Sequence, residues 1–465
     1  MTGLLLRRVE LSVGVRDVAV RDGRVAQIGI GLAADGAEVI DGRGGALLPG
    51  LHDHHLHLHA MAADAASVRC GPPQVRTPEA LARALDAAPG DGWIRGVGYV
   101  ETVAGLLDAA ALDRLHARRP VRVQHRSGAL WILNSAASSL VGLESADHRG
   151  VERDDTGRPT GRVWRADAWL RERLPATGPP PLDAVGTDLT RFGITGVTDA
   201  TPDLPPDSLA ALIDAHTTGA LPQRLHLLGA PVGDDPASRP ATVTTGPYKI
   251  VLADSGLPDF EALSAAVRRA HAHGRPVAVH CVSREALLLL LAVFDEVGTL
   301  PGDRIEHGAL IPAESIPELR RHDLCVVTQP GFLTHRGDDY LDRVDPRDLP
   351  DLYRCRSLLD NAVPLAMSSD APYGPLDPWA VIAAATTRRA PTGHVVGAPE
   401  KITAAEALDR YLTPLDDPGG EPRRLEVGAP ADLILFDRPL TDVLTDPSAQ
   451  FLRCTISRGQ IRHYR

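Results

Sequence analysis

The sequence predicts an α/β protein built on a (β/α)8 barrel, and three observations support this. Short apolar segments alternate with helical patterns along most of the chain, as expected of βα units around a parallel sheet. Eight such segments can be counted, and most are roughly twenty to forty residues apart, which leaves room for a strand, a helix and two loops. The chain of 465 residues is long enough for a barrel of about 250 residues with additions.

The eight predicted barrel strands are short and apolar, and several end at a polar side chain. They cover residues 46–48, 194–199, 224–229, 248–252, 277–281, 304–307, 324–328 and 365–369. The gap between the first and second strands is far too long for one helix, so we predict an insertion at about 62–190, rich in Pro, Gly and Arg. The barrel with its insertion is predicted to span 48–404.

Both ends of the chain have a different texture, in which alternating strands are separated by tight turns. Val18–Val20 precedes the turn at Asp22-Gly23, and residues 431–437 and 454–459 repeat the pattern near the other end. We therefore predict that residues 1–47 and 405–465 pair into a small β-sandwich domain.

Composition excludes several classes of function. The net charge of -11 and pI of about 5.9 argue against nucleic acid or anionic membranes as partners, which require clustered basic residues. The longest apolar run has nine residues, against about 20 for a spanning helix, and no secretory signal is apparent. The five cysteines are scattered and are expected to be reduced. A cytoplasmic location is the expectation.

A histidine cluster follows the first predicted strand. His55 and His57 are two residues apart, so on extended backbone both imidazoles point to one side and can bind one ion such as zinc. A His-x-His pair alone is also common at surfaces, but further candidates follow later strands. His280, His307 and Asp370 each come at the carboxyl end of a predicted strand, where the catalytic residues of such barrels gather. Taken singly, each of these could be a packed histidine or a helix cap.

Lys249 lies within the apolar fourth strand, where a lysine is unfavourable unless it is paired or neutral. An ordinary ion-paired lysine reaching the rim is the simpler interpretation. Lys249 and Lys401 are, however, the only lysines among 49 basic residues, so a plain cation here would more naturally be arginine. A buried lysine can lose its proton, and the neutral amine can take up carbon dioxide to form a carbamate whose oxygens bridge two ions.

These residues, in this order, resemble the amidohydrolase superfamily, and within it the YtcJ-like (amidohydrolase 3) group. The resemblance covers nearly the whole length and extends to the segments 92–99, 134–137, 304–307, 369–372 and 428–433. One departure is that similar sequences often carry a histidine, a residue that could contact substrate, just before the Asn-Ser element at Asn134, where residues 127–131 of this chain contain none.

The resemblance implies a metal-dependent hydrolase that cleaves a non-peptide C–N bond of a small molecule through a metal-activated hydroxide. It implies that His55, His57 and Asp370 hold one zinc ion and that His280 and His307 hold a second, with carboxylated Lys249 as the bridge. Asp370, His307 and Lys249 are the expected catalytic residues. One ion or two, and a homodimer as the default assembly, are consistent with it.

Specificity is expected to come from the loops and the insertion. The candidate substrate contacts are polar or aromatic side chains near strand ends or in the insertion, each of which could equally serve in packing or at the surface. They are Tyr99, His125, Trp131, Gln329, Arg336 and Tyr373.

Two alternatives remain open. A zinc deaminase on the same barrel would share most of the ligands. A His-x-x-Glu pattern at the fifth strand is typical of such enzymes, whereas in this chain Glu285 stands five positions after His280. A non-catalytic scaffold relative would have lost its ligands, and this chain keeps every ligand position. Ring opening of a cyclic amide fits the same hydrolytic chemistry.

Overall fold

The computed structural model describes residues 3–465 except 176–177, 235–236, 238 and 254–255. The chain folds as two compact units. We call Met1–Met61 with Pro181–Arg465 the main unit and Ala62–Pro180 the insertion unit. Among the described residues, no helix combines the length and apolar character needed to cross a membrane.

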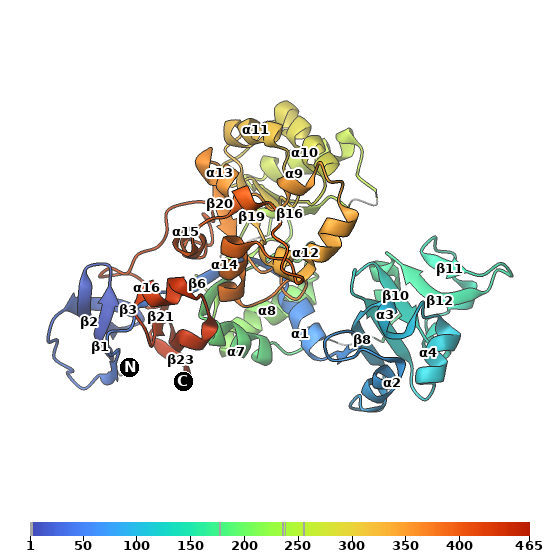
Figure 1. The fold of residues 1–465 in the computed structure, drawn as a ribbon, viewed down its shortest axis with the longest axis horizontal. Coiled ribbons are helices and arrows are strands. Elements are labelled where there is room, and N and C mark those ends of the chain that lie inside the picture. Colours follow the sequence, from blue (N-terminus) through green and yellow to red (C-terminus); the bar gives the residue numbers. More distant parts are fainter. Residues whose placement is uncertain (1–2, 176–177, 235–236, 238, 254–255) are drawn as a thin grey trace. The chain divides into compact units, whose positions relative to one another are not determined.

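Two parallel sheets with surrounding helices lie at the centre of the main unit and confirm the predicted α/β class (Figure 1). The first has the order β15-β14-β13-β6, with Val243–Thr245 (β15), Arg224–Leu227 (β14), Ile194–Asp199 (β13) and Leu51–Leu56 (β6). The second has the order β16-β17-β18-β19-β20, with Tyr248–Val251 (β16), Val277–Cys281 (β17), Arg304–His307 (β18), Cys325–Thr328 (β19) and Leu365–Met367 (β20).

Backbone hydrogen bonds connect the two parallel sheets at both edges. The Lys249 N–H in β16 donates to the carbonyl of Leu228, which directly follows β14, at 3.2 Å. At the other edge, the Asp370 N–H donates to the His55 carbonyl at 2.9 Å and links the end of β20 to β6. The carboxyl ends of strands from both sheets therefore meet at one place.

Helices follow most of these strands. In the main unit they are Leu58–Ala65 (α1, which runs into the insertion unit), Asp183–Arg191 (α7), Pro206–Thr218 (α8), Phe260–Ala272 (α9), Arg284–Val297 (α10), Ile316–Arg321 (α11), Gly331–Arg343 (α12), Arg356–Asp360 (α13), Pro378–Thr387 (α14), Ala404–Asp409 (α15) and Leu440–Thr445 (α16).

Helix α10 illustrates why these segments are helical. The Ser283 side chain accepts a hydrogen bond from the Ala286 N–H and caps the amino end. Leu287, Leu290 and Phe294 recur at three- and four-residue spacing and are buried on one face. Gly298 then follows the last helical residue at φ 81°, a conformation that favours glycine.

Two further sheets, formed by residues near the two ends of the sequence, contain antiparallel strand pairs and share one apolar core. One has the order β3-β2-β1-β4, with Arg24–Gly29 (β3), Gly14–Arg21 (β2), Leu4–Leu11 (β1) and Glu38–Asp41 (β4). The other has the order β23-β22-β21-β5, with Gln460–Tyr464 (β23), Leu452–Ser457 (β22), Leu433–Phe436 (β21) and Leu47–Pro49 (β5). Leu6, Val18 and Ile40 from the first sheet pack in one cluster with Leu435 and Ile456 from the second.

The prediction of the first barrel strand was wrong in its position. Residues 46–48 were expected to start the parallel sheet, but Leu47–Pro49 pairs antiparallel with β21, and the first parallel strand is Leu51–Leu56. The change of sheet takes place at Gly50. A Cβ there would lie 2.2 Å from the Thr195 Cγ2 atom, so only glycine fits where the chain passes between the two sheets.

The insertion unit contains a mixed six-stranded sheet in the order β11-β12-β10-β9-β8-β7. Its strands are Val151–Arg153 (β11), Pro159–Trp164 (β12), Leu130–Leu133 (β10), Val121–His125 (β9), Ile94–Tyr99 (β8) and Val68–Arg69 (β7). Its helices are Pro78–Asp86 (α2), Glu101–Ala104 (α3), Ala109–Leu115 (α4), Ser135–Leu140 (α5) and Asp167–Arg171 (α6). The unit ends at Pro180, ten residues before the predicted end of the insertion, and α7 belongs to the main unit.

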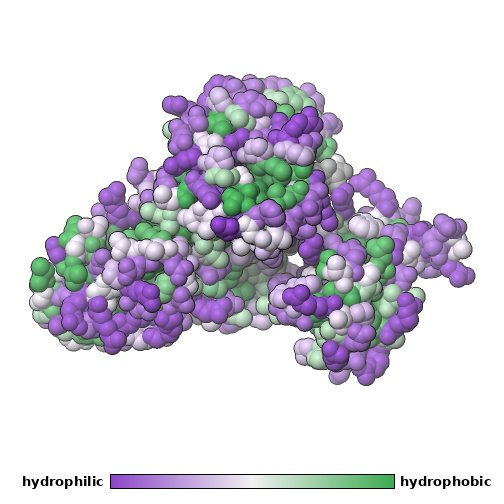
Figure 2. Space-filling model, in the orientation of Figure 1, coloured by the Kyte–Doolittle hydropathy of each residue, from purple (hydrophilic) through white to green (hydrophobic). Residues whose placement is uncertain are grey.

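Figure 2 shows that polar side chains dominate the visible surface while apolar ones appear in scattered patches. Trp379 of α14 lies in the main unit's interior, fully buried, with its ring edge-on to Phe436 of β21 at 5.2 Å between centroids. This contact connects a helix of the parallel sheets to the carboxyl-terminal sheet.

Trp379→Ala is expected to lower the free energy of unfolding by about 3–5 kcal/mol, because the substitution leaves a large cavity in a packed interior. Val13→Ala, at a side chain that is 63 % exposed, serves as the control and should change it by less than about 0.5 kcal/mol. Denaturant titration followed by circular dichroism measures both, and equal values for the two variants would contradict the assigned packing.

Candidate metal centre

The metal-ligand candidates come from five different parallel strands or the loops directly after them. His55 is in β6, Lys249 in β16, His280 in β17 and His307 at the end of β18, while Asp370 follows β20. Because the carboxyl ends of parallel strands meet at one edge, residues far apart in sequence converge here.

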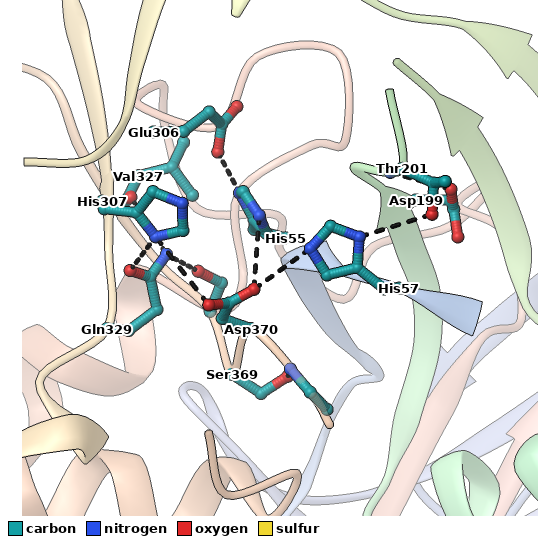
Figure 3. Close-up of polar contacts among 12 residues, drawn as sticks. His55, His57, Asp199, Thr201, Glu306, His307, Val327, Gln329, Ser369 and Asp370 are labelled. Carbon is teal, nitrogen blue, oxygen red and sulfur yellow. Dashed lines mark hydrogen bonds and ion pairs between the residues drawn. The ribbon is translucent and has the colours of Figure 1, made fainter. Parts of the chain in front are cut away.

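His55, His57 and Asp370 form the tightest group. One ligand atom from each lies within 4.8 Å of the others. The His57 Nε2 atom is 3.2 Å and the His55 Nε2 atom 3.5 Å from the same carboxylate oxygen, Asp370 Oδ1. Figure 3 shows both imidazoles turned toward this carboxylate. Two imidazoles and a carboxylate in this arrangement are a favourable ligand set for a divalent transition ion.

His307 and His280 continue the cluster on its other side. The His307 ring centroid is 4.7 Å from that of His55 and 4.4 Å from that of His280, and the His307 Nδ1 atom is 4.0 Å from Asp370 Oδ2. The structure therefore brings all four histidines and the aspartate of the predicted set into one place.

Lys249 is buried beside this group. Its Nζ atom has no hydrogen-bond partner within the described part of the chain. Burial lowers the pKa of Lys249, although the charges of Glu306 and Asp370 oppose this. Lys249 pairs with Ala278 of β17, two residues before His280, and its charge lowers the pKa values of His55 and His280.

The contact between His55 and Asp370 indicates that a cation belongs at this site. The His55 Nδ1 atom forms a short hydrogen bond with the buried Glu306 carboxylate, so Nδ1 carries the proton and Nε2 presents a lone pair. That lone pair faces Asp370 Oδ1, and neither atom makes a well-formed hydrogen bond to any described residue. Two buried electron-rich atoms in this position repel each other unless a cation lies between them. The residues present thus fit a divalent metal ion.

Protonation states at neutral pH suit metal binding. Burial, followed by the charge of Lys249, lowers the pKa values of His55 and His280 to about 4, so both imidazoles are neutral. Burial alone would raise the pKa of Asp370, but the adjacent His57, followed by His307 and His55, lowers it instead. Neutral imidazoles and an ionised carboxylate are the forms that bind a metal.

Glu306 is a functional residue that the sequence analysis did not single out. It is fully buried, holds the Nδ1 side of His55, and accepts a hydrogen bond from Arg304 Nε at 2.6 Å. Such a carboxylate fixes the tautomer and orientation of a metal-binding imidazole. The signal available in the sequence was Arg304 and Glu306 two residues apart in an apolar strand, where charges are rarely placed without a purpose.

Two ligand candidates have a backbone conformation that residues other than glycine rarely adopt. The φ angle is 71° at His307 and 53° at Asp370, both in the left-handed region. Non-glycine residues are held there only when the surrounding structure fixes them, and such positions cluster at functional sites.

Gln329, predicted as a substrate contact, is buried next to the ligands. Its Oε1 atom is 2.9 Å from the His307 Nδ1 atom, and its Nε2 donates to Ser368 Oγ at 2.9 Å and to the Val327 carbonyl at 3.2 Å. The amide therefore orients His307 in this structure, as Glu306 orients His55 (Figure 3).

Tyr373 lies at the rim of the metal centre. Its ring is 5.6 Å from that of His57 in an edge-on arrangement, and the residue is 44 % exposed. Arg336, the neighbouring candidate, donates from Nη2 to the Tyr373 carbonyl at 3.2 Å and lies over the Phe332 ring. Tyr373 thus combines access to solvent with contact to a ligand candidate.

Three predicted substrate contacts belong to the insertion unit and have partners within it. The Tyr99 hydroxyl donates to the Gly105 carbonyl at 2.5 Å, and the Trp131 Nε1 donates to Asp167 Oδ1 at 2.7 Å. Both side chains are buried in the unit's apolar clusters. His125 contacts Ser127 Oγ at 2.7 Å and Glu101 Oε2 at 3.3 Å. Packing within the insertion unit accounts for Tyr99 and Trp131.

This fold and site define a class, the hydrolases of the amidohydrolase superfamily. The model of the Amidohydrolase family matches residues 38–463, and the chain belongs to that family. It is an enzyme, a hydrolase of carbon–nitrogen bonds, and the predicted resemblance to YtcJ-like amidohydrolases is confirmed.

Particular relatives extend this similarity over most of the chain. An N-substituted formamide deformylase of Arthrobacter pascens is 27 % identical, covering 96 % of this chain and 95 % of the relative. The putative amidohydrolase YtcJ of Bacillus subtilis is 24 % identical over 80 % of each chain. A crystal structure of an uncharacterized metal-dependent hydrolase from Pyrococcus horikoshii has a TM-score of 0.77 at 20 % identity, with 99 % of this chain and 100 % of that one covered.

Glu306→Gln is expected to weaken metal binding by about ten- to a hundredfold, because the amide no longer holds a proton on His55 Nδ1 as strongly as the carboxylate does. Glu296→Gln, which removes a carboxylate ion-paired with Arg268 at the surface, is the matched control and should leave the affinity unchanged. Competition against a chromogenic chelator measures it. Unaltered affinity in the Glu306 variant would show that this contact does not support the metal centre.

Proposed function

We propose that the protein is a metal-dependent hydrolase that cleaves an amide, N-acyl or cyclic amide bond of a small molecule. One observation carries the proposal: the His55 Nε2 atom, which presents a lone pair, lies 3.5 Å from Asp370 Oδ1 in a buried cluster of imidazoles. The similarity to an N-substituted formamide deformylase supports a non-peptide C–N bond as the target.

We infer further that the two parallel sheets close into a (β/α)8 barrel. The hydrogen bonds from Lys249 to Leu228 and from Asp370 to His55 lie at the two places where closure requires contact. Residues 48–404 would then form the barrel domain, and the two terminal sheets that share a core would form the β-sandwich.

His55, His57 and Asp370 would hold one divalent ion, with zinc the best match to these donors, and His280 and His307 a second. Lys249 would bridge the two as a carbamate: once deprotonated, its Nζ adds to the carbon of carbon dioxide, an electron pair of one C=O bond moves to oxygen, and the nitrogen releases a proton. When bound, such ions lower the pKa of a water towards about 7 and polarise a carbonyl oxygen.

The chain's own residues would move the proton and position the reactants. The Asp370 carboxylate is ionised and lies beside His57 and His307, so it can accept a proton from the attacking water. It can then deliver this proton to the leaving nitrogen, which must be protonated to depart as an amine. Tyr373, exposed beside His57, is placed to contact the substrate.

The zinc deaminase alternative receives less support. Such an enzyme needs a glutamate near the fifth-strand histidine to carry protons. Glu285 lies in the first turn of α10 and is exposed, whereas His280 is in β17. The scaffold alternative would leave buried histidines and an aspartate with unsatisfied atoms and no compensating ion.

Asp370→Asn is expected to keep the fold and lower turnover at least about a hundredfold, since a carboxamide cannot accept the proton. Hydrolysis of a panel of N-formyl and N-acyl amines, with circular dichroism for the fold, provides the measurement. Asp345→Asn, at an exposed aspartate, is the control. Turnover of the Asp370 variant within a factor of two of the parent would refute its role.

Lys249→Ala is expected to reduce bound metal and activity, and an added short carboxylate such as propionate should restore part of both, because its two oxygens can replace those of a carbamate. Lys249→Arg keeps a cation, fills the space and should not respond to propionate. Metal content by atomic emission and turnover are followed together. Full metal and activity in both variants would exclude the bridge.

A further inference from the structure

Two adjoining cavities lie at the amino ends of the parallel strands. Their volumes are about 470 and 340 Å³, and both are lined by Arg224, Thr242 and Pro430, so they share a wall. Small-molecule sites have volumes of about 300–1,000 Å³. Arg224 is the first residue of β14, whereas the ligand candidate His307 is the last residue of β18. The cavities are therefore at the opposite end of the strands from the metal centre.

The smaller cavity carries an excess of positive charge. Arg24, Arg224 and Arg458 line it, with Asp22 as the carboxylate among its lining residues. The Arg24 Nη1 donates to the Gly428 carbonyl at 2.8 Å, which does not neutralise its charge. The Arg224 Nε donates to Asp432 Oδ2 at 2.7 Å. Three guanidinium groups thus gather around a space with fewer carboxylates than arginines.

Arg458 is the member of this group with the most donors available. Its backbone N–H donates to Asp432 Oδ1 at 2.7 Å, but its guanidinium makes neither a hydrogen bond nor an ion pair with a residue in the described part of the chain. Asp432 is already engaged by Arg224, so it does not serve this guanidinium. An anion in the smaller cavity would find free N–H donors there.

The larger cavity is balanced in charge and lined mainly by apolar atoms. Arg224, Arg423 and Arg424 are matched there by Asp416, Glu426 and Asp432. The apolar part of the wall comes from leucines and prolines at or next to the first or last residues of strands and in the segment before β21. They include Leu225, Leu415, Leu425, Leu433, Pro49 and Pro414. This cavity therefore suits an uncharged, apolar body rather than a second charged group.

We propose that the two cavities together bind a small amphipathic carboxylate. Its carboxylate lies between Arg24, Arg224 and Arg458, and its apolar body extends past Arg224 into the larger cavity. The site is separate from the metal centre and would be occupied at the same time as it.

Isothermal titration of the metal-loaded full chain with octanoate and with acetate tests this proposal. Octanoate should bind with saturation, and at least tenfold more tightly than acetate, because only the longer chain reaches the apolar walls. Absence of saturable octanoate binding, or equal affinities for the two acids, would overturn the proposal.

Variants separate this site from carboxylate binding to the metal. Arg458 has φ 51°, which asparagine tolerates, so Arg458→Asn removes the guanidinium without straining the backbone. It should weaken octanoate binding about tenfold or more. Arg43→Asn, the same change at an exposed arginine with φ 54°, is the matched control and should bind like the parent. Parent-like binding by Arg458→Asn would refute the assignment.

Ala241→Trp provides a second variant that removes no polar contact. Ala241 is an exposed residue that lines the larger cavity, so an indole there should occupy part of the space for the apolar body. Octanoate affinity should fall at least tenfold while acetate affinity changes by less than threefold. If both acids bind the variant as they bind the parent, the apolar body does not occupy this cavity.

Discussion

The site depends on one unfavourable contact, the approach of the His55 Nε2 lone pair to the Asp370 carboxylate in a buried cluster. The short hydrogen bond to Glu306 prevents His55 from relieving it by moving its proton to Nε2, because the proton is held on Nδ1. Arg304 Nε in turn donates a hydrogen bond to the Glu306 carboxylate and holds it in place. The protein therefore maintains a point of negative electrostatic potential that a divalent cation would neutralise. The strand ends and the left-handed backbone at Asp370 keep the two side chains in place.

Much of this arrangement could be predicted from local spacing. The two-residue interval between His55 and His57 places both on one side of a strand, and the position of His307 and Asp370 after apolar strands puts them at the same edge. Lys249 was distinguished by composition, since a chain that uses arginine almost everywhere retains lysine inside a strand. The spacing signals lie within a few residues, the lysine signal is a count over the chain, and neither requires knowledge of long-range contacts.

The remaining features depend on contacts that sequence spacing does not encode. The role of Glu306 is visible only once the fold brings its side chain to His55, because the two residues are 251 positions apart. Residues 46–48 have the same apolar character in either sheet, so the pattern could not indicate that they pair with β21. In the same way, Trp131 has the sequence context of a pocket residue, whereas its neighbours in the insertion unit enclose it in a core and bind its indole N–H.

Gly50 is the single residue between a strand of the carboxyl-terminal sheet and the strand that carries His55. Its N–H donates to the Asp432 carbonyl at 2.8 Å, and its carbonyl accepts from Arg423 at 2.6 Å. These two residues therefore hold the start of the strand that carries His55. Residues more than 370 positions further along the sequence thus complete the support of the strand that carries His55. Substitutions at these distant positions would impair catalysis without touching a ligand.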